Sequence, residues 1–246
     1  MKIGLTSTGA LLLCVLLAGC DGGGSSPQQP PPPQPQGTAP PPPTPLQGQF
    51  KMEGRGYWDI ARTSDYAIII PRNWSQITEQ QPEAAKLYLV KRGVVDETGN
   101  PVEVGLMVEQ FPSHPRSIDE EIERLITRYK QLEENELLND PMVQNVQLAD
   151  GTTGQLLLLE MLTKGKIVRR SVVVKLLATD ETKNMWIVTG YVAAGSDSLI
   201  GTRESSIFQM LLTHVTSFSL DPQQVDERPI HEIYHAQAMP PAQEPQ

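Results

Sequence analysis

Cysteine is almost absent from this chain: its 246 residues include only Cys14 and Cys20. No cysteine follows position 20, so the remainder of the chain cannot form a disulfide of its own. Long hydrophobic runs are also missing, and the apolar run at the N-terminus, 10–17, covers only part of a bilayer core of roughly 30 Å. These two absences exclude a disulfide framework and argue against a membrane-spanning helix at the N-terminus.

Positive charge is scarce as well. The chain carries 20 Lys and Arg against 29 Asp and Glu, which gives a formal net charge of −9 at pH 7. An acidic balance disfavours binding to nucleic acid and electrostatic adhesion to anionic lipids. A phosphate-binding loop is missing too, because Gly151-Thr152-Thr153-Gly154 lacks the lysine and the helix that such a loop requires. The pattern predicts a hairpin turn there instead, so neither a nucleic-acid nor a nucleotide site is indicated.

The first twenty residues have the features of a secretory signal. A basic start at Lys2 is followed by the apolar run and then by Leu17-Ala18-Gly19-Cys20. This tetrapeptide resembles the bacterial lipobox, which implies cleavage before Cys20 and attachment of lipid to its thiol. Each buried methylene of an acyl chain contributes about 0.8 kcal/mol, so two or three chains anchor a protein stably. Asp21 resembles the inner-membrane retention signal of enterobacterial lipoproteins, which implies a periplasm-facing location at the inner rather than the outer membrane.

Composition divides the chain into four segments: a signal peptide (1–19), a lipidated cysteine with a Pro/Gly-rich linker (20–56), a globular domain (57–221) and a Pro/Gln-rich tail (222–246). The linker cannot build a core, and its proline tracts favour extended polyproline II, which gives a reach of roughly 100 Å. We interpret it as a spacer, with docking of the proline tracts to a partner as the alternative. The tail is expected to lack structure apart from a short helix at 231–239.

Apolar and β-branched runs between turn signals predict the strands of the domain. They lie at 66–70, 86–90, 102–111, 143–148, 155–162, 168–177 and 185–193. The turns between the later runs are short, so neighbouring strands are expected to be antiparallel. The leucines of 155–161 are continuous and do not alternate, which predicts a central strand covered on both faces.

Two helices complete the predicted domain. Ser117-Ile118-Asp119-Glu120 has the form of a capping box, and a helix is expected to begin there. Its apolar stripe should pack on a sheet and consists of Ile118, Ile122, Leu125, Ile126, Tyr129 and Leu132. A second helix is expected over 202–216, followed by Phe218 as a core residue. This order of elements predicts an α+β fold, an antiparallel β-sheet packed with helices.

Three of these segments resemble the superfamily of photosynthetic PsbP, bacterial DcrB and mycobacterial LpqN. They are Ile68-Ile69-Ile70-Pro71-Arg72-Asn73-Trp74, the helix opened at Ser117, and the closing helix ending in Thr216-Ser217-Phe218. The resemblance spans nearly all of the globular domain and implies the PsbP-like α/β sandwich. Its members are mostly non-catalytic binding or assembly factors, which implies that this chain is not an enzyme. A fold alone does not fix an activity, and no shared catalytic residues exist to carry over.

The tail contains a literal H-E-x-x-H sequence, His231-Glu232-Ile233-Tyr234-His235. In zinc peptidases this spacing places two imidazoles on one helical face, and the glutamate acts as general base. A catalytic site also needs a third protein ligand on a rigid framework, whereas Glu244 is the only side-chain carboxylate that follows the motif. We therefore predict no catalytic residue and no cofactor, and keep His231 and His235 as candidates for adventitious metal binding.

Other polar residues suggest no catalytic group. Ser196-Asp197-Ser198, His114 and His214 form no recognisable triad, and exposed or capping roles are expected for the two histidines. A basic cluster on a predicted hairpin is expected to be solvated edge charge that blocks aggregation between strands. This cluster consists of Lys164, Lys166, Arg169 and Arg170.

The three tryptophans are the remaining candidates for a ligand-binding wall. Large aromatic side chains belong more often to the core, and we expect this for Trp74 and Trp186. Trp58 falls at the junction between linker and domain and is expected to be the first docked residue.

Together these features predict a non-catalytic, lipid-anchored envelope protein that contacts the membrane through its anchor. It would bind or position an envelope protein partner or a small ligand in the periplasm. One alternative is a carrier of lipid or another apolar ligand, which requires a sizeable apolar cavity. The other is a zinc-dependent hydrolase that uses His231, Glu232 and His235.

Overall fold

The computed structural model describes residues 51–54, 57–78 and 82–232. Cys20, Asp21, the proline tracts and His235 lie outside the described residues, so their predicted roles stay predictions. All described residues belong to one compact unit, 43–246. Within them, no helix is both long enough and apolar enough to cross a membrane.

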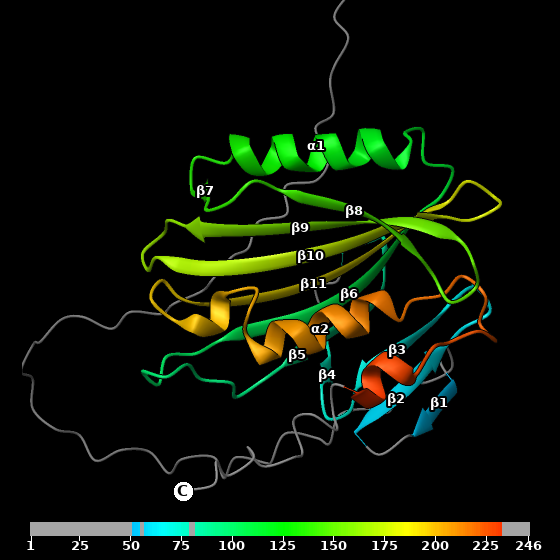
Figure 1. The fold of residues 1–246 in the computed structure, drawn as a ribbon, viewed down its shortest axis with the longest axis horizontal. Coiled ribbons are helices and arrows are strands. Elements are labelled where there is room, and N and C mark those ends of the chain that lie inside the picture. Colours follow the sequence, from blue (N-terminus) through cyan, green and yellow to red (C-terminus); the bar gives the residue numbers. More distant parts are fainter. Residues whose placement is uncertain (1–50, 55–56, 79–81, 233–246) are drawn as a thin grey trace, which may run out of the picture. The chain divides into compact units, whose positions relative to one another are not determined.

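Two antiparallel sheets form the framework (Figure 1). The small sheet has the order β1 (Lys51–Gly54), β2 (Trp58–Arg62), β3 (Ala67–Pro71). The large sheet has eight strands in the order β4-β5-β6-β11-β10-β9-β7, with β8 also paired to β9. Its strands are β4 (Ser75–Gln76), β5 (Ala85–Lys91), β6 (Glu103–Phe111), β7 (Asn135–Leu137), β8 (Met142–Gln147), β9 (Thr153–Thr163), β10 (Arg169–Thr179) and β11 (Met185–Gly195).

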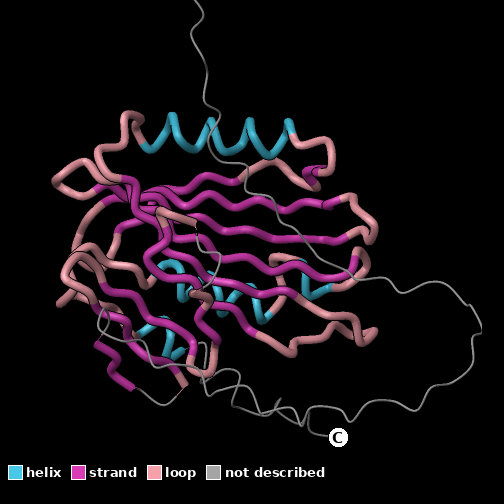
Figure 2. The backbone as a smooth tube through the Cα atoms, turned by 180° about the vertical axis from the view of Figure 1, so that it is seen from behind, coloured by secondary structure: helices cyan, strands magenta, loops and turns pink. Residues whose placement is uncertain are grey.

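The α+β class and all seven predicted strands are confirmed. The strands that the sequence did not predict are β1, β2, β4 and β7, which have five residues or fewer and are too short for a clear hydrophobic pattern. β9 lies inside the sheet, between β10 and the short strands β7 and β8, as its continuous leucines indicated. Seen from behind, the long strands run side by side with α1 along one border (Figure 2).

The large sheet separates two hydrophobic cores because successive side chains of a strand point to opposite faces. On β10, Val172, Val174 and Leu176 enter the core beneath α2 (Ser206–Thr216). Val173 and Leu177 of the same strand enter the core beneath α1 (Ile118–Gln131). The two helices therefore cover opposite faces, and the central strands carry long runs of apolar residues for that reason.

The capping box at the start of α1 is confirmed. The Ser117 hydroxyl accepts a hydrogen bond from the Glu120 backbone, and the Glu120 carboxylate accepts one from the Ser117 backbone at 2.8 Å. The predicted stripe packs on the sheet as far as Tyr129. Leu132 departs from the prediction: it is the C-cap residue and its side chain is exposed, because the helix ends at Gln131.

α2 begins four residues later than predicted, at Ser206, because a short 3₁₀ helix, η1 (Leu199–Gly201), precedes it. The Ser205 hydroxyl caps its first turn by accepting a hydrogen bond from the Phe208 backbone at 3.1 Å. The helix lies very close to β11 at Gly190. A Cβ atom there would lie 2.8 Å from Leu211 Cγ, so only glycine permits this approach. Phe218, just beyond the helix, is fully buried as predicted.

The ordered fold extends past both predicted domain boundaries. β1 lies before position 57 and pairs with β2 along its whole length. After position 221 the chain returns to the small sheet, where Ile230 is fully buried against Trp58, Ile60 and Ile69. The second face of β2 and β3 is apolar, and Val225 and Ile230 cover it, which corrects the expectation of no structure for the described part of the tail, 222–232.

One five-residue loop occurs twice in the domain. Asp96-Glu97-Thr98-Gly99-Asn100 precedes β6, and Asp180-Glu181-Thr182-Lys183-Asn184 precedes β11. In each loop one aspartate oxygen accepts three hydrogen bonds from the threonine and asparagine that follow. Burial raises the pKa of Asp180, but hydrogen bonds from Thr182, Trp186 and Asn184 outweigh it and lower this pKa to about 2. Both loops use a left-handed fourth residue, at φ 84° for Gly99 and 62° for Lys183.

The two loops predict opposite effects of substitution at that fourth position. Gly99→Ala should destabilise the protein by about 1 kcal/mol, because a side chain disfavours the left-handed conformation. Lys183→Gly should stabilise it by roughly 0.5 kcal/mol, since relief of that strain exceeds the entropy that glycine adds to the unfolded chain. Urea unfolding of both variants measures these changes. Equal losses of stability in the two would contradict this account.

Candidate functional site

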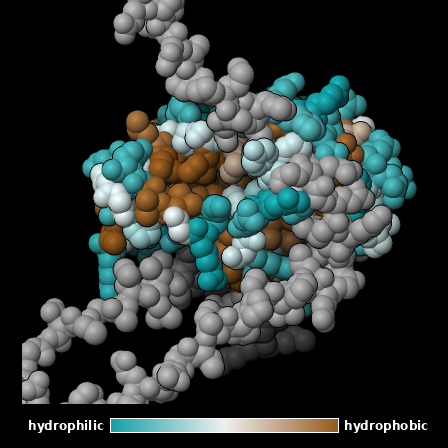
Figure 3. Space-filling model, turned by 90° about the horizontal axis from the view of Figure 1, so that it is seen from below, coloured by the Kyte–Doolittle hydropathy of each residue, from teal (hydrophilic) through white to brown (hydrophobic). Residues whose placement is uncertain are grey.

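A groove lies where the small sheet, the β5–β6 hairpin and α2 meet. Its volume is about 270 Å³. The side of the molecule on which α2 and β5 lie shows a gathered apolar surface bordered by hydrophilic side chains (Figure 3). We call this site the Trp74 groove; it is lined by Tyr57, Pro71, Arg72, Asn73, Trp74, Lys91, Val94, Val104, Ile207 and Met210.

The end of β3 forms one wall of the groove. Pro71 is the last residue of the strand, and Asn73 then turns the chain with a left-handed backbone at φ 66°, a conformation that asparagine tolerates better than most residues. Trp74 follows this turn and is only partly buried, with one part packed on the core and another facing the groove. The prediction that Trp74 belongs to the core is therefore only half right, whereas Trp186 is buried as predicted.

The chemistry of the lining suits binding more than catalysis. Apolar side chains from three elements form most of the surface, and the aromatic rings of Tyr57 and Trp74 flank them. Arg72 and Lys91 add positive charge, and Arg72 also contacts Asp59 at 3.0 Å. Among the described residues that line the groove there is no histidine, carboxylate, serine or cysteine. The lining therefore offers no serine or cysteine as a nucleophile and no histidine or carboxylate as a general base.

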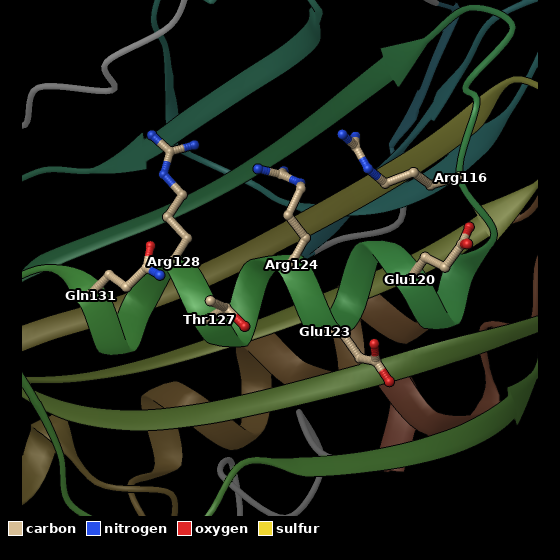
Figure 4. Close-up of a pocket in the computed structure, with 7 residues that line it drawn as sticks. All are labelled: Arg116, Glu120, Glu123, Arg124, Thr127, Arg128 and Gln131. Atoms are coloured by element: carbon tan, nitrogen blue, oxygen red, sulfur yellow. The ribbon is translucent and has the colours of Figure 1, made fainter.

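A second hollow, of about 530 Å³, lies along the outer side of α1. Arg116, Arg124 and Arg128 extend from this region in the same direction (Figure 4). Glu120 and Glu123 share the lining, together with Thr127 and Gln131. Mixed charges without apolar side chains are typical of a solvated helix face, so we regard the Trp74 groove as the better candidate site.

The buried carboxylate of Glu121 organises this end of α1. Arg124 donates two hydrogen bonds to it, one of them 2.8 Å long, and Arg116 approaches it at 3.6 Å. The bonds to Glu121 raise the pKa of Arg124 above its usual value. His114 Nε2 lies 3.8 Å from the same carboxylate, so His114 is a neighbour of the start of α1.

The other predicted polar candidates do not meet. Ser198 caps η1 and donates to Glu97 at 2.8 Å. His214 is neither exposed nor a capping residue. It is fully buried, and its Nδ1 donates to the carbonyl oxygen of Ile69 at 2.9 Å. This prediction was wrong because β3 covers α2, a contact between segments about 145 residues apart that sequence patterns do not show.

The start of the H-E-x-x-H sequence contacts Trp58. The ring of His231 meets that of Trp58 edge-on, with centroids 4.7 Å apart, and Trp58 Nε1 donates to Glu227 at 3.2 Å. Trp58 is buried and belongs to the core between the small sheet and Ile230. The sequence predicted it only as the first docked residue after the linker. In the described part of the chain, no group of three or more His, Cys, Asp or Glu side chains is placed to hold a metal.

The predicted basic cluster is not uniformly solvated. Arg169 pairs with Glu103, and Arg170 pairs with the buried carboxylate of Glu160. β10 lies in the middle of the sheet, not at an edge, so its first residues find carboxylates on their neighbours. Lys164 and Lys166, in the turn before the strand, are exposed. The expectation of solvated edge charge is therefore corrected for the two arginines.

No protein-family model matches this chain, and no curated protein matches it. Among solved structures, it is similar to PsbP of Synechocystis sp. PCC 6803, with 13% identity over 71% of this chain and 98% of that one and a TM-score of 0.42. It is also similar to LpqN of Mycobacterium tuberculosis, with 10% identity over 63% and 82% and a TM-score of 0.41. A third similar structure is the Ran-binding protein Mog1p of Saccharomyces cerevisiae, with 12% identity over 63% of this chain and 90% of that one and a TM-score of 0.40. Likeness at this level of identity concerns the fold alone.

Burial of His214 predicts a loss of stability in acid. Burial lowers its pKa to about 4, and the bond to Ile69 opposes this only partly. Because the unfolded chain takes up a proton near pH 6.5, stability is complete above that pH and falls as the pH drops towards 4, by roughly 3 kcal/mol in total. Urea unfolding between pH 7.5 and 4 measures this, with His214→Gln as the comparison. A pH dependence as steep in the variant as in the wild type would refute it.

Proposed function

We propose that this chain is a non-catalytic, lipid-anchored envelope protein that holds a segment of a protein partner in the Trp74 groove. The observation that carries the proposal is the lining of that groove. It combines two aromatic rings and an apolar floor with two basic side chains. Tyr, Trp, Met and Arg are enriched where proteins bind proteins, and all four types occur here.

The size of the groove favours a partner segment over a small apolar ligand. Clefts that enclose drug-sized ligands have volumes of about 300–1,000 Å³, and the groove has about 270 Å³. A lipid carrier needs an enclosed apolar cavity, whereas the core under α2 is filled by side chains such as Leu106, Leu176 and Leu211, all fully buried. A shallow site of this size suits one or two side chains of a protein surface.

The anchor is the second part of the proposal and rests on the sequence. Lipid on Cys20 would keep the domain at the membrane, and the residues up to β1 would set its distance from the bilayer. A tethered binding domain meets its partners at a high effective concentration, so a groove of modest affinity suffices.

Trp74→Ala should weaken partner binding at least tenfold. Truncation of an aromatic anchor at an interface costs about 2 kcal/mol or more, and each 1.4 kcal/mol corresponds to a factor of ten. Quantitative capture of crosslinked envelope proteins compares the wild type, Trp74→Ala and the control Leu132→Ala. Leu132 is exposed at the end of α1, outside the groove lining. Partners that bind all three equally would show that the groove is not the binding site.

Met210→Ala serves as a second groove variant, because it shortens a side chain of α2 and leaves Trp74 in place. It should lower capture of the same partners as Trp74→Ala. Thermal unfolding of each variant ensures that a loss of binding is not a loss of the fold.

Cys20→Ser should move the protein from the membrane to the soluble fraction. Without the thiol no diacylglycerol can attach, and the apolar free energy of the acyl chains is lost. Fractionation and mass spectrometry of the wild type check this, with Cys14→Ser as the control that keeps the anchor. An unmodified Cys20, or a chain that still begins at Met1, would refute the anchoring.

A further inference from the structure

Exposed apolar side chains occur in the β9–β10 connection and in the helical turn that follows β11. Ile167 is 58% exposed and Val168 is 41% exposed, in the connection between the two strands. Leu199, which is 70% exposed, begins η1. Single exposed apolar residues are common on any protein, so their meaning depends on whether they lie together.

The contacts of η1 place these residues at the same end of the sheet. A Cβ atom at Gly201 would lie 2.7 Å from the carbonyl oxygen of Arg170, so η1 packs directly on the first residues of β10. Val168 precedes this strand by one residue. The connection before β10 and the helical turn with Leu199 are therefore neighbouring projections of the large sheet.

Basic side chains accompany the apolar ones. Lys164 and Lys166 lie in the same connection, and both are exposed. Lys164 forms an ion pair with Glu136, and both side chains are more than half exposed. Exposed ion pairs of this kind contribute little to stability. The arginines behind them are held by Glu103 and Glu160, which fixes the base of the hairpin.

We infer that this end of the sheet is a membrane-contact surface, which we call the hairpin-tip surface and which consists of Lys164, Lys166, Ile167, Val168 and Leu199. Projecting apolar side chains flanked by lysines fit the boundary between acyl chains and anionic phosphate groups of a bilayer. Each lysine near an anionic surface adds attraction of its own. The net charge of −9 opposes this contact, so the attraction has to come from the basic tip itself.

This surface extends the proposed function and rests on it in one respect: the proposed lipid anchor brings the domain to the bilayer. An anchor and a weak second contact together orient a domain that neither would orient alone. The test therefore removes the anchor and measures the tip by itself.

Vesicle flotation tests the inference with the mature chain, residues 20–246, carrying Cys20→Ser. It should bind vesicles of phosphatidylglycerol and phosphatidylethanolamine at least fivefold more than vesicles of phosphatidylcholine, and added salt should weaken the binding. Ile167→Ser with Leu199→Ser should lower the binding at least fivefold, and so should Lys164→Gln with Lys166→Gln. Leu132→Ser is the control and should bind as the parent does.

Several outcomes would overturn the inference. These are no flotation of the parent chain, equal binding to neutral vesicles, or equal binding by all variants. Because the changed side chains are exposed, an unaltered urea midpoint is expected and shows that each variant is folded. A failure here would leave the Cys20 fractionation and the Trp74 capture unaffected, so the two proposals fail separately.

Discussion

The structure depends on the packing of α2 between β11 and β3. On one side Gly190 lets the helix lie against the large sheet, where Leu211 and Val215 are fully buried. On the other side the helix end bonds to both backbone groups of Ile69: His214 donates to the carbonyl, and the Ser217 hydroxyl accepts from the N–H at 3.0 Å. The two sheets are joined through this helix, and the Trp74 groove exists because the helix holds them at that separation.

Ion pairs with buried carboxylates hold further parts of the fold in position. Glu121 and Glu160 are nearly inaccessible. Glu121 binds Arg124 of its own helix and lies near Arg116 of the preceding connection, whereas Glu160 binds Arg170 of the neighbouring strand. Arg203 also lies 3.1 Å from Glu160 and so ties the segment before α2 to β9. Removing one partner of a buried pair leaves an uncompensated charge, which costs far more than a surface pair contributes. Such pairs fix the start of α1, through Arg116, and the base of the β9–β10 hairpin, through Arg170.

Local patterns predicted the elements well, and long-range contacts decided where the predictions failed. The capping box at Ser117 and the strand at 185–193 depend on residues close in sequence, so their signals are visible there. Neither the burial of His214 nor the pairing of Arg170 has a local sign in the sequence, because their partners, Ile69 and Glu160, come from other strands. The groove could not be predicted for the same reason: Trp74 is conspicuous in the sequence, but Ile207 and Met210 join it only through the docking of α2.

The sequence by itself determined the lack of disulfides after position 20, the acidic charge, the order of the longer strands and of the helices, and the expectation of a lipid anchor at Cys20. These follow from composition and from patterns of a few neighbouring residues, whose physics is local. Only the tertiary structure decided which apolar side chains stay exposed, which charges are paired and where a groove opens. Those properties arise when separate strands and helices are brought into contact, and a linear pattern does not contain the distances between them.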